Sequence, residues 1–138
     1  MKYEDKNLSV LESIDWGILP ENMSSIVKRC YELRRVKLRD LSPDDIRFLI
    51  GQEIGLDYLI PMAIKILEKT PYIETLYFSG DLMKNVLQVK PIYWNKKKNQ
   101  KDEIKCIIDK HINSFVEIDN LEEGSKEELF NLQMRFCQ

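Results

Sequence analysis

Apolar residues between positions 38 and 87 recur every three or four residues, which is the spacing of one face of an α-helix. A first helix begins at Ser42-Pro43-Asp44-Asp45. Here Ser42 can accept a bond from a free backbone N–H group, Pro43 suits the first helical position, and the aspartates favour the positive end of the helix dipole. Gly55 can adopt the left-handed conformation that ends a helix. We therefore expect a helix between Ser42 and Gly55.

The next helix, over residues 57–69, is apolar around most of its circumference. One apolar line consists of Leu56, Leu59, Ile60, Ala63, Ile64 and Leu67, and a second of Tyr58, Met62 and Ile66. A helix that is apolar on nearly all sides is normally buried. We therefore expect this helix to form the centre of the core, and Thr70-Pro71 to end it.

Five other segments show helical spacing or residues typical of helix starts. They lie at 8–14, from Ser24 or Ser25 to about 36, after Ser79-Gly80-Asp81, across 104–115, and after Ser125, where Glu128 completes a capping box. Residues 71–78 suggest an ordered loop, and residues 115–118 could form a short extended piece. The pattern predicts an all-α fold of six or seven helices.

Length and composition indicate one domain over residues 1–138. The chain has 43% hydrophobic and 32% charged residues, an ordinary balance for a globular protein large enough to fold without a metal ion or disulfide. Three scattered cysteines (Cys30, Cys106 and Cys137) and one histidine give neither a disulfide framework nor a zinc-ligand set, so we expect no cofactor. No signal peptide or membrane-spanning run is apparent, so we expect a cytoplasmic protein without membrane contact.

Several motifs give the chain a family resemblance. Residues 38–64 read LRDLSPDDIRFLIGQEIGLDYLIPMAI, and further matching sites are Asp15-Trp16-Gly17, residues 29–35, Pro71, Gly80-Asp81-Leu82 and Trp94. In this order they resemble the immunity proteins of bacterial contact-dependent growth inhibition (CDI) systems, over roughly residues 8–94. The chain departs from the family pattern at Thr75-Leu76 and at Ser79. The resemblance implies a helical protein that binds a toxin delivered by a neighbouring cell, in a 1:1 complex, and blocks it.

Neither catalysis nor nucleic-acid binding is well supported by the residues. His111 and Cys106 are five positions apart, so on a helix they point in different directions, and no phosphate-binding glycine loop is present. We therefore do not expect an enzyme. A helix-turn-helix DNA-binding regulator over residues 46–69 is the alternative, although its second helix carries only Lys65 and Lys69 as bases. The basic run Lys28, Arg29, Arg34, Arg35, Lys37 and Arg39 could contact phosphates, or be a solvated face partly paired with Glu32 and nearby acids.

Charge is unevenly distributed along the chain. The formal net charge is −2, but residues 102–128 hold nine acidic and three basic side chains, a net of −6. Such a region can steer a basic partner, or can simply be a solubilising surface. The expected cytoplasmic location implies a toxin that acts in the cytosol. Nucleases are the commonest such toxins in these systems, and nuclease clefts are positively charged. The toxin-binding candidates are therefore Glu117, Asp119, Glu122, Glu123, Glu127 and Glu128.

Overall fold

The computed structural model describes residues 2–138, and over this range the chain forms eight α-helices and two short 3-10 helices without a named strand. The 3-10 helices are η1 (Lys2–Asp5) and η2 (Leu38–Asp40). The α-helices are α1 (Leu8–Leu11), α2 (Ser25–Leu33), α3 (Pro43–Gly51), α4 (Leu56–Lys69), α5 (Asp81–Leu87), α6 (Pro91–Lys96), α7 (Lys98–Val116) and α8 (Glu123–Phe136). The all-α prediction is confirmed, but the count of six or seven is wrong. The short helix α6 is not among the helices predicted from the sequence, and it begins at Pro91 because proline fits the first helical turn.

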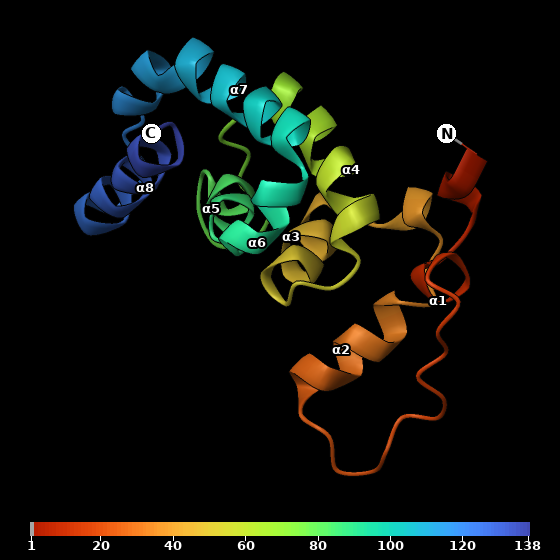
Figure 1. Cartoon of the computed structure of the whole chain (residues 1–138). Helices are drawn as coiled ribbons and strands as arrows, with labels where there is room; N and C mark the ends of the chain where they lie inside the picture. Colours follow the sequence, from red (N-terminus) through yellow and green to blue (C-terminus); the bar gives the residue numbers. More distant parts are fainter. Residues whose placement is uncertain (1) are drawn as a thin grey trace.

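Helix α4 lies at the centre of the fold, packed against α3, α5 and α7. Figure 1 shows α5 between α3 and α8, with α7 crossing above, while α1, α2 and the loop between them extend to one side. Leu59, Ile60, Ala63 and Leu67 are fully buried, and Ile64 is nearly so. The prediction that this helix forms the core is confirmed. None of the helices within residues 2–138 combines the length and apolar character needed to cross a membrane.

The start of α3 follows the local sequence closely. Ser42 Oγ accepts from the Asp45 backbone N–H at 3.1 Å, and Asp45 Oδ2 accepts from the Ser42 N–H at 3.0 Å, which completes a capping box. The end of α3 differs from expectation, because the helix ends at Gly51 and not at Gly55. Glu53 and Gly55 both have positive φ, of 55° and 67°, so the left-handed Gly55 is confirmed but precedes α4. The turn between α3 and α4 uses two residues in the left-handed conformation. Of these, only Gly55 could be recognised from the sequence, because glycine adopts this conformation without steric cost.

Gly55→Val is expected to lower the free energy of unfolding by about 2 kcal/mol or more. A Cβ atom at Gly55 would lie 2.7 Å from both Leu8 Cδ1 and Leu8 Cδ2, and the backbone φ of +67° adds strain. Leu8 is fully buried, so its side chain cannot move aside without disturbing the core. Denaturant unfolding measures the loss. Gly124→Val is the matched control, since nothing lies within 4 Å of its Cβ position. Equal midpoints for the two variants would contradict the expected strain.

Two expectations for the C-terminal part are wrong. Residues 115–118 are not extended, because α7 continues to Val116 and Phe115 is fully buried against the Tyr72 ring, with centroids 4.8 Å apart. The Ser125–Glu128 capping box is absent, because α8 already begins at Glu123. The ammonium of Lys126 instead donates hydrogen bonds to the Val116 carbonyl at 2.8 Å and to the Ile118 carbonyl at 2.5 Å. This cation satisfies the Val116 carbonyl, which the helix leaves free at its end, and the Ile118 carbonyl in the connection that follows.

Candidate binding surface

The acidic segment, residues 117–128, covers the end of α7, the connection to α8 and the first turns of α8. All six candidate residues are exposed to solvent: Glu117, Asp119, Glu122, Glu123, Glu127 and Glu128. Glu123 and Glu127 border one shallow hollow, whose lining also includes Phe115, Val116 and Phe130. Glu128 lies apart from this hollow and accepts from Lys84 of α5 at 3.0 Å. The structure therefore brings two of the candidates to one hollow and directs a third toward α5.

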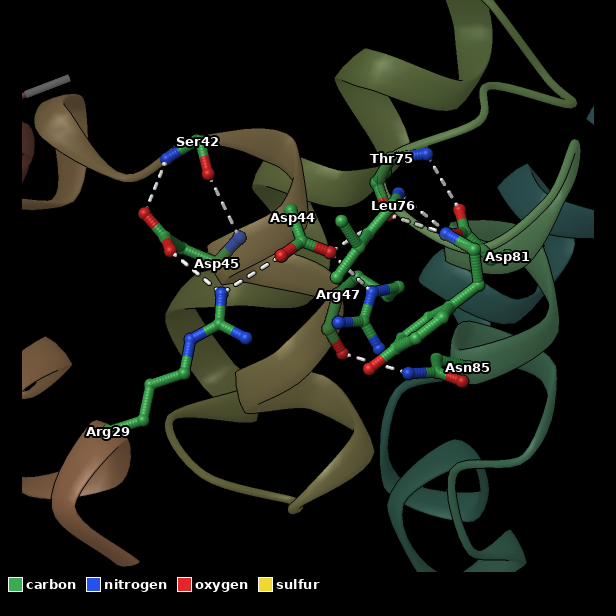
Figure 2. Close-up of polar contacts among 10 residues, drawn as sticks. Arg29, Ser42, Asp44, Asp45, Arg47, Thr75, Leu76, Asp81 and Asn85 are labelled. Carbon is green, nitrogen blue, oxygen red and sulfur yellow. Dashed lines mark hydrogen bonds and ion pairs between the residues drawn. The ribbon is translucent and has the colours of Figure 1, made fainter. Parts of the chain in front are cut away.

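A buried carboxylate holds the loop that precedes α5. Asp81 is only 2% exposed. Its oxygens accept from the backbone N–H groups of Thr75 (2.9 Å), Leu76 (3.1 Å) and Tyr77 (2.9 Å), and from the Thr75 hydroxyl at 2.9 Å (Figure 2). Burial opposes ionisation of Asp81, but these bonds outweigh it and hold its pKa below the ordinary value. The expectation of an ordered loop at 71–78 is confirmed.

Asp44 ties the same loop to α3. Its carboxylate accepts from Arg47 Nε at 2.7 Å and from Arg29 Nη2 at 3.0 Å, and the Thr75 hydroxyl lies 3.1 Å from its Oδ1 atom (Figure 2). Burial raises the pKa of Asp44, but the two guanidinium groups and the Thr75 hydroxyl together lower it by more than burial raises it. The pKa of Asp44 is therefore below its ordinary value. Sequence reasoning assigned Asp44 to the helix start alone. The Asp44–Arg47 spacing of three residues was a local signal for this ion pair.

The loop held by Asp81 adjoins the acidic segment. Ser79 and Asn120 exchange hydrogen-bonding contacts at 3.2 and 3.4 Å. The ammonium of Lys84 lies 5.5 Å from the Phe78 ring centroid and also pairs with Glu128. The loop and the acidic segment therefore form one continuous surface beside α5. This loop is not among the six toxin-binding candidates named from the sequence, and comes only after the acidic segment as a surface to test; it contains the departures from the family pattern at Thr75-Leu76 and Ser79.

All four arginines of the basic run are paired with carboxylates, whereas Lys28 and Lys37 are exposed to solvent. Arg29 pairs with Asp44 and Asp45, Arg34 with Glu12, Arg35 with Asp15 and Arg39 with Asp5. Glu32 is not among the partners found within residues 2–138, so that part of the expectation is wrong. These arginines hold neighbouring segments together instead of presenting their charge to phosphates. Together with the burial of α4, this pairing removes the main support for a helix-turn-helix DNA reader.

The only histidine and Cys106 both come from α7 and border one shallow hollow, together with Glu68 of α4. No hydrogen bond joins Cys106 to His111 in the described part of the chain, so the two side chains do not form a nucleophile–base pair there. Across residues 2–138, no cluster of three or more histidine, cysteine, aspartate or glutamate side chains is placed to hold a metal ion.

Comparison with known proteins identifies the family. A family model of CDI immunity proteins matches residues 10–104, which reach from α1 into α7. No curated protein shows a match to the chain. The family match contains the loop held by Asp81 and ends before the acidic segment. It extends about ten residues beyond the sequence resemblance and covers well over half of the 138 residues. The chain therefore belongs to the family of CDI immunity proteins.

Proposed function

We propose that this protein protects its cell by binding a CDI toxin in the cytosol, in a 1:1 complex, and that the toxin is a nuclease whose cleft receives the acidic segment. The protein acts by occupying its partner and not by turnover, with residues 1–138 serving as one binding unit. The observation that carries the proposal is the row of exposed carboxylates over residues 117–128, on a chain that belongs to an immunity family.

Charge supports the assignment of a basic partner. A nuclease cleft must be positive to hold a polyanion, and carboxylates can occupy it in place of phosphates. One cation within the acidic segment and one beside it are already engaged, since Lys126 binds the Val116 and Ile118 carbonyls and Lys84 pairs with Glu128. The remaining carboxylates therefore face solvent with little local compensation. Such a surface accelerates encounter with a positively charged partner.

The hollow beside Glu123 and Glu127 indicates which side chain of the toxin it can bind. Its lining combines the apolar residues Phe115, Val116 and Phe130 with the two carboxylates and with Lys126. The ammonium of Lys126 is engaged by the Val116 and Ile118 carbonyls. A lysine or arginine side chain suits this combination, because its aliphatic stem can lie on apolar surface while its charged head meets a carboxylate. The acidic segment also lies outside residues 10–104, so it can differ between family members without altering the residues that define the family.

Reversal of Asp119, Glu122 and Glu123 to lysine is expected to slow association with the toxin about tenfold or more at low salt, because steering depends on these charges. Folding should be nearly unaffected, since exposed charges contribute little to stability. The measurement is the association rate with the C-terminal toxin domain of the cognate CDI effector, across a range of salt concentrations.

A matched control changes the same amount of charge elsewhere. Glu21, Glu32 and Glu68 are also exposed but lie outside the acidic segment, and their reversal to lysine gives the same change in net charge. This control should reduce the association rate far less. An unchanged rate for the Asp119, Glu122 and Glu123 variant would place the interface elsewhere. Equal slowing by both variants would mean that net charge alone, and not the acidic segment, guides association.

A further inference from the structure

The 74–79 loop displays two large apolar side chains at its tip. Glu74 and Ser79 form an isolated antiparallel bridge, and the Gly80 N–H donates to the Ile73 carbonyl at 3.1 Å to close the base. Between them, the Leu76 and Tyr77 side chains are 57% and 67% exposed. Neither side chain is buried in the core, so both are available for contact with a partner.

The tip is also held rigid. Three consecutive backbone N–H groups, from Thr75 to Tyr77, donate to the one buried carboxylate of Asp81. The guanidinium of Arg47 lies 4.8 Å from the centroid of the Tyr77 ring, and Arg47 is itself fixed by Asp44. A loop ordered before binding loses little conformational entropy when it meets a partner. Tyrosine is also among the residues that most often dominate binding energy at interfaces.

The surroundings of the loop indicate which partner it meets. Through the Ser79–Asn120 contact and the Phe78–Lys84–Glu128 contacts, the tip continues directly into the acidic segment. A positively charged partner that binds those carboxylates therefore also contacts the loop. We propose that Leu76 and Tyr77 are the apolar anchor of the toxin interface, and that they enter an apolar pocket beside the basic cleft of the toxin domain. This inference rests on the proposed function.

The two parts of this surface have different kinetic roles. Exposed charges act mainly on the rate of encounter, whereas a buried apolar anchor acts mainly on the rate of dissociation. Replacing both Leu76 and Tyr77 by alanine is therefore expected to raise the dissociation rate about tenfold or more while the association rate changes less than about threefold. The thermal midpoint should stay within about 3 °C, because both side chains are largely exposed.

The test compares three proteins for binding to the cognate toxin domain: the wild type, the Leu76→Ala/Tyr77→Ala variant, and a control. The control is Val10→Ala/Ile92→Ala, which removes two apolar side chains of similar exposure (58% and 66%) from α1 and α6. Faster dissociation for the loop variant alone supports the anchor. Unchanged dissociation for the loop variant, with a wild type that binds, overturns the anchor and leaves the proposed function standing.

Two other outcomes separate the claims further. If the wild type does not bind the toxin domain, the proposed function fails and the anchor fails with it. Sedimentation of the wild type and the loop variant without toxin tests a second copy of the chain as the occupant. Self-association of the wild type that is lost in the Leu76→Ala/Tyr77→Ala variant would overturn the toxin assignment of this loop.

Discussion

Leu59→Ala and Ile64→Ala are each expected to lower the free energy of unfolding by about 2–5 kcal/mol. The two side chains are 0% and 2% exposed on α4, which packs against α3, α5 and α7. Each truncation removes apolar contacts and leaves a cavity that three surrounding helices cannot fill without moving. Denaturant unfolding monitored by circular dichroism gives the free energies.

Lys65→Ala provides the control for this pair, because Lys65 is exposed on the same helix and alanine favours helix formation. Its effect should stay within about 0.5 kcal/mol. A loss below about 1 kcal/mol for both core variants would show that α4 is peripheral. It would also contradict the claim that α4 supports the loop and the acidic segment.

Asp81→Asn is expected to cost about 2–4 kcal/mol near neutral pH. Both carboxylate oxygens of Asp81 accept hydrogen bonds, Oδ1 from Thr75 N–H and Oδ2 from the Thr75 hydroxyl, Leu76 N–H and Tyr77 N–H. An amide NH₂ group in either position would face a donor instead of accepting from it. Unfolding experiments at pH 7 measure the cost, with the exposed Asp109→Asn as a control that should change nothing.

The pH dependence of this difference tests its electrostatic origin. The pKa of Asp81 lies below its ordinary value of 3.8, so the folded state favours the ionised form. The stability that Asp81 contributes is therefore fully present above the unfolded pKa and is lost as the pH falls from about 4 through the folded pKa. The gap between wild type and Asp81→Asn should narrow over that range. A gap that keeps its full size at pH 2 would mean that packing, and not charge, holds the loop.

Features determined by local chemistry could be predicted from the sequence. Ser42 and Asp45 are three residues apart and satisfy each other's backbone groups, so the capping box needs no distant partner. The left-handed Gly55 and the apolar circumference of α4 are likewise local properties, and both are present. The family resemblance also rests on this part of the chain, and the family match contains most of it.

Features that depend on tertiary partners could not be predicted in the same way. Arg34 pairs with Glu12, 22 positions away, and Lys126 binds the Val116 carbonyl at the end of α7, so neither partner follows from helical spacing. Asp81 looked like an ordinary helix-start residue, and only the folded loop reveals that it accepts from three successive N–H groups. Exposed carboxylates such as Glu117 and Glu123 carry no local signal that separates a binding surface from a solubilising one, which is why the binding role is tested with the toxin itself.

The most direct measurement is a calorimetric titration of the cognate toxin domain with this protein, with the residual toxic activity assayed at each addition. The proposed function predicts one protein bound per toxin domain, and activity that falls to zero as that ratio is reached. A toxin domain that remains fully active in the presence of a large excess of this protein, or that releases no heat and shows no binding by sedimentation, would contradict it.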